Sequence, residues 1–185
     1  MKKPGLLVIL VGHGQFPLDM PHTLQTEYLT LLHKRDRTPQ EEQRLTELTK
    51  TVLSWPRNEG NDPYWSSVRK LALLLEQALK DSKVMVAFNE FCPPLLEEAL
   101  ENACKSNHRK IMVLTTKLIP GGVHSEIEIP RLIEDFSRRY GKKIVYVWPI
   151  DMQNLVELYV KEIEVRLKQL ALETMFNNSP RLKPL

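Results

Sequence analysis

The chain has 185 residues, a formal net charge of +3, 42% hydrophobic residues and 26% charged residues. This length and composition predict a single globular domain over residues 1–185. The mild charge argues against a nucleic-acid partner and is compatible with an anionic small molecule. No apolar stretch reaches the roughly 18 residues of a membrane span, so we expect no membrane segment and a cytoplasmic protein.

The two cysteines, Cys92 and Cys104, form no CxxC motif. Two free thiols in a cytosolic protein are therefore expected rather than a disulfide scaffold. The basic start of the chain precedes an apolar run, as in a secretion signal, but that run breaks at Gly12-His13-Gly14 and no small-residue cleavage site follows. We therefore expect no signal peptide.

The most informative stretch is the apolar run over residues 5–11, which ends at Gly12-His13-Gly14. A short apolar run without polar alternation is typical of a strand buried on both faces of a parallel sheet. The two glycines permit a sharp turn, so we expect His13 at the carboxyl end of the strand. In open α/β sheets, ligands bind at that edge.

Strands and helices alternate along the rest of the chain. Further strands are predicted at residues 83–88, 110–116 and 143–148. Helices are predicted at about residues 22–34, 39–53, 63–79, 93–106, 125–140 and 153–173. This alternation predicts an α/β fold in which a four-stranded parallel sheet lies between layers of helices. The tail at about 174–185 is expected to fray.

Two of these helices have clear start signals. Residues 38–41 (Thr-Pro-Gln-Glu) combine an N-cap threonine with proline at the first helical position and glutamate at the third, and Asp62-Pro63 follows the same logic. The helices at 22–34 and 39–53 form a predicted helical hairpin. Because a minimal α/β pattern does not need this hairpin, we interpret residues 17–62 as a helical insertion.

Three polar side chains follow buried strands. His13 follows the first strand, Glu90 the second, and His124 the loop after the third. The carboxyl ends of parallel strands share one edge of the sheet, so these side chains are expected to converge there. Two imidazoles and a carboxylate suit a first-row divalent metal such as cobalt, iron or nickel. The sequence therefore predicts a metal site.

Each of these residues also has a purely structural interpretation. His13 could fill a glycine-rich turn, and Glu90 could cap the helix that Pro93 opens. His124 could simply lead into residues 125–128 (Ser-Glu-Ile-Glu), a second capping-box pattern in which Glu128 is a helix cap rather than a ligand. The shared position at the sheet edge favours the metal site.

Other candidates carry weaker signals. Cys92 is close to Glu90 and is interpreted as a small buried residue, with a ligand role as the less favoured alternative. The remaining histidines lie in predicted helical or surface settings, and no functional role is assigned to them: His22, His33 and His108.

Several short motifs occur in a fixed order. They are Val11-Gly12-His13-Gly14, Ala87-Phe88-Asn89-Glu90 with Pro94 and residues 96–100, and Pro120-Gly121-Gly122-Val123-His124 with Glu128-Ile129-Pro130. This ordered set resembles the small class II chelatases, the sirohydrochlorin cobaltochelatases and ferrochelatases of the CbiX and SirB type. The resemblance covers residues 5–16 and about 83–170.

The resemblance implies a three-layer, chelatase-like (flavodoxin-like) domain that inserts cobalt or iron into sirohydrochlorin or a related tetrapyrrole in cobalamin or sirohaem biosynthesis. It places the metal-binding and catalytic roles on His13, His124 and Glu90. It implies Co²⁺, Fe²⁺ or Ni²⁺ as co-substrate and no organic cofactor. It also implies a homodimer, because short members pair to mimic the two-lobed long forms.

The chain departs from the family pattern at Gln15, where serine is common, at Glu128, where aspartate is common, and in the insertion at 17–62. The insertion bears on which macrocycle fits. Lys117 and Arg131 flank the His124 loop and are candidate partners for macrocycle carboxylates, the alternative being ordinary solvated charge.

Three other functions stay open at this point. The same scaffold could be a non-catalytic carrier of a metal or tetrapyrrole, or the hairpin at 22–53 could dock a partner beside an inert α/β body. A different ring, such as a porphyrin, could be the substrate.

Overall fold

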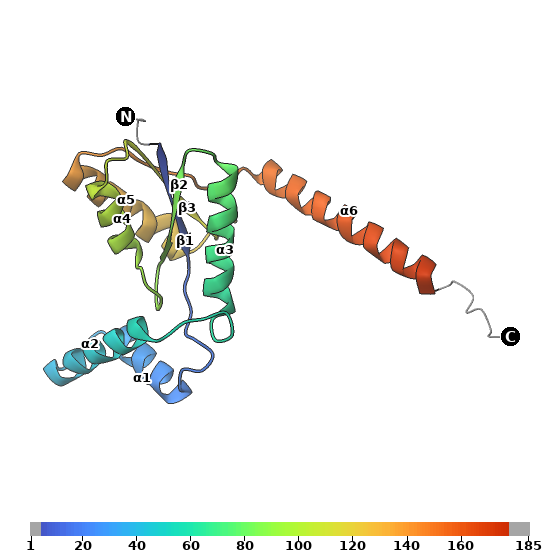
Figure 1. The fold of residues 1–185 in the computed structure, drawn as a ribbon. Helices are drawn as coiled ribbons and strands as arrows, with labels where there is room; N and C mark the ends of the chain where they lie inside the picture. The colour runs from blue at the N-terminus through green and yellow to red at the C-terminus, as the bar shows by residue number, and fades with distance from the viewer. Residues whose placement is uncertain (1–4, 178–185) are drawn as a thin grey trace. The chain divides into compact units, whose positions relative to one another are not determined.

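The structure is a computed structural model that describes residues 5–177 (Figure 1). Its contacts divide the chain into two units, one ending at Trp148 and one beginning at Pro149, which are described separately. The second unit contains the helix α6 (Met152–Asn177). This helix continues beyond residue 173, where it was expected to end, and the rest of the expected tail lies outside the described residues. No helix within residues 5–177 is long and apolar enough to cross a bilayer.

The first unit is built on a four-stranded, all-parallel sheet, as predicted. Its strands, in the spatial order β2-β1-β3-β4, are β2 (Lys83–Phe88), β1 (Leu6–Gly12), β3 (Lys110–Thr115) and β4 (Ile144–Tyr146). All three pairings are parallel, so every strand ends at the same edge of the sheet. β1 lies between two other strands, and six of its seven residues are buried. This position explains why its sequence is continuously apolar.

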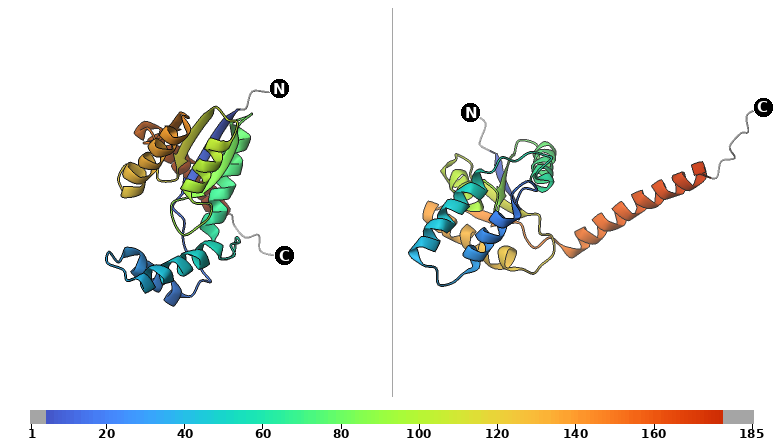
Figure 2. Two further views of the ribbon diagram at one scale, coloured as in Figure 1. Left: turned by 90° about the vertical axis from the view of Figure 1, so that its left-hand side faces the viewer. Right: turned by 90° about the horizontal axis from the view of Figure 1, so that it is seen from below.

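Helices cover both faces of the sheet (Figures 1 and 2). The helix α3 (Pro63–Ala78) lies on one face, and α4 (Leu96–Lys105) and α5 (Ile129–Tyr140) lie on the other. Alternate side chains of β1 enter the two cores, Val8 toward α3 and Ile9 toward α4 and α5. Each fully buried aliphatic side chain of this kind contributes about 1.5–3 kcal/mol.

The predicted helical hairpin is present. It consists of α1 (His22–His33) and α2 (Pro39–Ser54) and lies beyond the carboxyl end of β1 (Figure 1). The Thr38 side chain accepts a hydrogen bond from the backbone of Glu41, and the Glu41 carboxylate accepts one from the backbone of Thr38, which completes the capping box. The hairpin has its own core, formed by Met20, Tyr28, Leu31, Leu48 and Val52.

The helix expected to begin at Pro93 begins instead at Leu96. The reason is that the preceding residues extend the sheet: the backbone N–H of Phe88 donates to the carbonyl of Pro94 at 2.9 Å, and Leu95 forms an isolated bridge with Phe88. Backbone that pairs with a strand is extended and cannot be helical. The segment between Phe88 and Leu96 is therefore an irregular loop.

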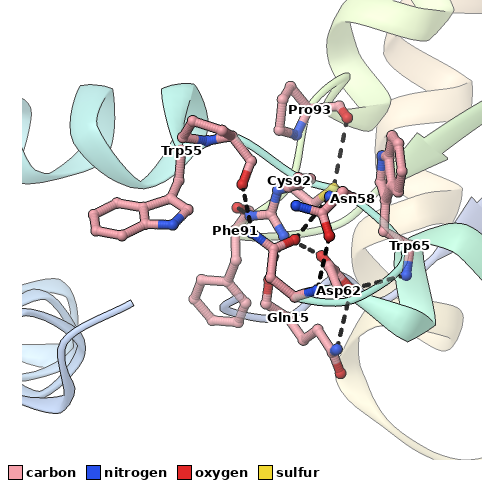
Figure 3. Close-up of polar contacts among 12 residues, drawn as sticks. Gln15, Trp55, Asn58, Asp62, Trp65, Phe91, Cys92 and Pro93 are labelled. Atoms are coloured by element: carbon pink, nitrogen blue, oxygen red, sulfur yellow. Dashed lines mark hydrogen bonds and ion pairs between the residues drawn. The ribbon is translucent and has the colours of Figure 1, made fainter. Parts of the chain in front are cut away.

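A buried ion pair joins three loops beside this sheet edge. The guanidinium of Arg57 contacts the carboxylate of Asp62, and their side chains are only 4% and 1% exposed. Arg57 also donates to the carbonyls of Gln15 and Phe91, while Asp62 accepts from the side chain of Gln15 and the backbone of Trp65 (Figure 3). The predicted N-cap at Asp62 is confirmed, whereas its buried partner Arg57 was not predicted.

We expect Asp62→Ala to lower the free energy of unfolding by about 3–5 kcal/mol, because Arg57 would keep a buried charge without a counter-ion. Urea denaturation measures this change. The matched control is Glu27→Ala, which breaks the half-exposed pair with Arg44 and is expected to change stability little. Equal effects of the two substitutions would contradict the assigned role of the buried pair.

Candidate metal centre

His13 directly follows β1 and is fixed by its backbone. Its N–H donates to the hydroxyl of Tyr64 on α3 at 3.0 Å, and that hydroxyl lies 3.0 Å from the hydroxyl of Thr116, just beyond β3. Tyr64 therefore ties the ends of two strands to a helix. This bond sets the position from which the imidazole projects.

Glu90 lies beside His13 because the ladder between β1 and β2 continues past the strand ends. The N–H of Asn89 donates to the carbonyl of Gly12, and the N–H of Glu90 donates to the carbonyl of His13, both at 3.0 Å. Gly14 has a φ of +91°, and a Cβ there would lie 1.9 Å from the carbonyl oxygen of Glu90. The second glycine of the motif is therefore required by its conformation and by this close approach.

His124 begins a π-helical turn, η1 (His124–Glu128), that leads directly into α5. The imidazole Nδ1 of His124 lies 2.5 Å from a carboxylate oxygen of Glu128. The capping box predicted here is wrong, because the Ser125 hydroxyl donates backward to the carbonyl of Gly121 and Glu128 contacts the imidazole instead. Single π-helical turns are frequent at functional sites.

The structure brings His13, Glu90 and His124 together. One ligand atom of each lies within 4.8 Å of the others, and Nε2 of His124 is 3.7 Å from Oε1 of Glu90. The imidazole rings of His13 and His124 meet edge to face with their centroids 4.9 Å apart. Metal–ligand bonds of about 2.0–2.2 Å place adjacent donors about 3–3.5 Å apart, so this set must contract slightly around an ion.

Hydrogen bonds orient both imidazoles in the same way. Nδ1 of His13 lies 2.9 Å from the carbonyl oxygen of Gly14, and Nδ1 of His124 faces the Glu128 carboxylate. Neither oxygen has a hydrogen to donate, so Nδ1 is the donor in both contacts, and in the neutral ring this places the lone pair on Nε2. A carboxylate behind a histidine also raises its basicity as a ligand. Both rings are therefore prepared to bind a cation through Nε2.

The two candidate anchor residues lie in different settings. Arg131 lines a cavity of about 260 Å³ together with Asn89, Glu97 and Glu128. Lys117 lies after β3, where its carbonyl accepts a hydrogen bond from the Trp148 indole at 3.0 Å. Arg131 therefore shares a cavity with Glu128, the residue whose carboxylate contacts His124.

Cys92 is fully buried, and its thiol donates to the carbonyl of Pro93. Burial raises the pKa of this thiol to about 12, so it is protonated at neutral pH. Since a metal binds the thiolate rather than the thiol, Cys92 fits the interpretation as a small buried residue.

Sequence reasoning missed the partner of His124. The four-residue spacing between His124 and Glu128 could have indicated it, because residues at i and i+4 lie on one face of a helix. It also missed Tyr64, for which the sequence carried no signal.

Comparison with known proteins identifies the family. A family model described as CbiX matches residues 61–167, which is more than half of the chain. The chain belongs to the CbiX family of chelatases. The CbiX match includes Glu90 and His124, whereas His13 and the hairpin precede it. No curated protein sequence matches the chain.

A CbiX-like fold is also found among solved structures. A CbiX protein from Marinobacter aquaeolei VT8, assigned to cobalamin (vitamin B12) biosynthesis, superposes with a TM-score of 0.52 and 16% sequence identity. The alignment covers 89% of this chain and 98% of that one. At this identity the likeness is one of fold.

We expect Glu128→Ala to weaken the binding of Co²⁺ about 10–100-fold, because His124 would lose the acceptor that fixes its ring and proton. Isothermal titration with the metal alone measures the affinity. Glu134→Ala on the exposed surface of α5 is the matched control, and its affinity should equal that of the wild type. An unchanged affinity in Glu128→Ala would show that this carboxylate does not support the site.

Neither Cys92 nor Cys104 should react with a thiol reagent in the folded protein near pH 8. Both are buried, and burial raises the pKa of each thiol, so the reactive thiolate is scarce. Absorbance after addition of an aromatic disulfide counts reactive thiols. Two should appear in denaturant, and rapid labelling without denaturant would contradict the buried placement.

Proposed function

We propose that this CbiX-family protein inserts cobalt or iron into sirohydrochlorin or a related cyclic tetrapyrrole, in cobalamin or sirohaem biosynthesis. The observation that carries the proposal is the set of three ligand atoms, from His13, Glu90 and His124, within 4.8 Å of one another. These groups lie at the carboxyl edge of a parallel sheet, where α/β proteins bind their ligands.

The donor set suits the metals proposed. Imidazole nitrogen prefers first-row ions such as Fe²⁺, Co²⁺ and Ni²⁺, whereas Mg²⁺ and Ca²⁺ prefer an all-oxygen site. The single carboxylate of Glu90 offsets part of the charge of the ion. With three protein donors, an ion of this kind keeps coordination positions open for the nitrogens of a macrocycle.

Insertion exchanges one divalent ion for two N–H protons of the macrocycle. As the ring nitrogens take over the ion, each protein donor that releases it regains a lone pair. The lone pairs of His13 and His124 at Nε2, and the carboxylate of Glu90, then become proton acceptors beside the ring. The same three groups can thus hold the ion and receive the protons. The imidazoles can do either only in their neutral form.

The site is open enough for a large ring. The side chains of His124 and Glu90 are 17% and 34% exposed, so both reach the surface of the protein. Gly121 and Gly122 precede His124 with φ values of +113° and +100°, and a Cβ at either position would meet no atom within 4 Å. This exposed glycine loop leaves space at the approach to His124.

We also propose that the protein works as a cytoplasmic homodimer. The support is the single chelatase-like lobe, since short chains resembling these enzymes pair to complete a two-lobed cleft. Light scattering should then give twice the chain mass of 21.5 kDa.

Incubation with sirohydrochlorin and Co²⁺, followed by absorption spectroscopy, tests the activity. We expect His13→Ala and His124→Ala each to lower the rate by on the order of 100-fold or more, because each removes a metal donor and a proton acceptor. His22→Ala is the matched control, because this exposed histidine lies on α1 and its imidazole hydrogen-bonds to Thr26 rather than to a site residue.

Full activity in either site variant would overturn the proposed chemistry. A wild-type protein that binds metal and macrocycle without producing the metallated spectrum would instead favour a carrier. The same assay with a porphyrin distinguishes the ring that is used.

A further inference from the structure

An aromatic cluster, formed by Phe16, Tyr28 and Phe91, lies directly beside the metal ligands. Phe91 follows Glu90 in the chain, and its ring centroid is 6.2 Å from that of His13. Phe91 packs on Phe16 with centroids 4.4 Å apart, and Tyr28 meets both rings edge to face at about 6 Å. The cluster thus joins the loop after β1, the loop after β2 and the helical hairpin.

Phe91 is held in an unfavourable backbone conformation. Its φ is +60°, in the left-handed region that bulky side chains avoid. The N–H of Cys92 donates to the carbonyl of Glu90 at 2.7 Å, which closes a tight turn around Phe91, and Arg57 donates to the carbonyl of Phe91. Glycine would adopt this turn without strain, so the phenylalanine ring is retained against a backbone cost.

Phe91 and Phe16 pack against the edge of the hairpin core, and that packing buries each ring only in part. The core of the hairpin is formed by buried residues such as Leu48 and Val52, which are 2% exposed or less. Both rings therefore keep some exposed apolar surface, and the ring of Phe91 lies 6.2 Å from that of His13. An open aromatic surface next to convergent polar groups is typical of a small-molecule site.

The hairpin approaches the candidate metal centre through Tyr28, whose ring meets that of Phe91, the residue next to Glu90, edge to face at 6.1 Å. Burial raises the pKa of the Tyr28 hydroxyl, and the negative charge of Glu90 raises it further. Tyr28 is therefore protonated and neutral at physiological pH. Through Tyr28, the helix α1 contacts the two phenylalanines that lie beside the candidate metal ligands.

We propose that Phe91, supported by Phe16 and Tyr28, is the surface on which one edge of the cyclic tetrapyrrole packs while the ring centre lies over the metal ligands. This assignment rests on the proposed function. It makes Phe91 a substrate-positioning residue and gives the helical insertion a role in selecting the macrocycle. Offset stacking between flat rings supplies both attraction and orientation.

The test measures macrocycle and metal separately. Phe91→Gly removes the ring and relieves the backbone, so misfolding of the turn is not expected, and Phe91→Tyr keeps a ring of the same shape. We expect Phe91→Gly to raise the KM for sirohydrochlorin about tenfold with little change in kcat, and Phe91→Tyr to stay close to wild type. Tyr140→Ala, which removes a half-buried ring from α5, is the control and should leave KM unchanged.

Two companion measurements decide the outcome. Titration with Co²⁺ alone should give the same affinity in Phe91→Gly as in the wild type, and titration with metal-free sirohydrochlorin should show about tenfold weaker binding. An unchanged KM, or a loss of Co²⁺ affinity equal to the rise in KM, would overturn the positioning role. If the wild type binds sirohydrochlorin through Phe91 but inserts no metal, the proposed function fails and the positioning role stands.

Discussion

The arrangement of the site depends on the buried ion pair between Arg57 and Asp62. Two charges removed from water are costly unless hydrogen bonds satisfy them. Here the guanidinium donates to two backbone carbonyls as well as to the carboxylate, and the carboxylate accepts from a side-chain amide and a helix N-terminus. Gln15 and Phe91 belong to the loops after β1 and β2, which border the candidate metal centre, and Trp65 belongs to α3, so the pair fixes both loops against this helix. A hydrophobic pair of similar size could fill the same volume but could not hold two carbonyls in place.

The sheet supplies the rest of the geometry. Because all four strands are parallel, His13 and Glu90 leave the sheet at one edge, and the ladder between β1 and β2 continues for two residues beyond the strands. Glu90 is therefore placed by backbone hydrogen bonds, which are more rigid than side-chain contacts. His124 arrives from the loop after β3 and is oriented from behind by Glu128. A site assembled in this way loses little entropy when it binds an ion, because its donors are already held.

Much of this arrangement could be predicted from the sequence because it follows from local patterns. The apolar run before His13 marks a doubly buried strand, and the end of such a run marks the sheet edge. The missed features all depend on tertiary contacts. In the sequence, Arg57 is a charged residue in a connector, and its burial depends on contacts with Gln15 and Phe91, which are distant along the chain. The late start of α4 depends on a backbone hydrogen bond between Phe88 and Pro94, and no local sequence pattern predicts this bond. The metal-binding roles themselves remain predictions that rest on chemistry.

The helical insertion lies beside the candidate site and has a core of its own. The apolar core of α1 and α2 is separate from the two cores of the sheet, so among the residues that the structure describes the hairpin adds no side chain to the buried cores around β1. It lies near the carboxyl edge of the sheet, where the ring of Tyr28 meets Phe16 and Phe91 and where the ion pair between Arg57 and Asp62 follows it in the chain. The strained turn at Phe91 and the buried charge of Arg57 are both local costs of this junction, and the burial of apolar surface elsewhere offsets them. Since the two costs fall at the edge of the candidate site rather than in the cores of the sheet, the scaffold can carry them without a change in its packing.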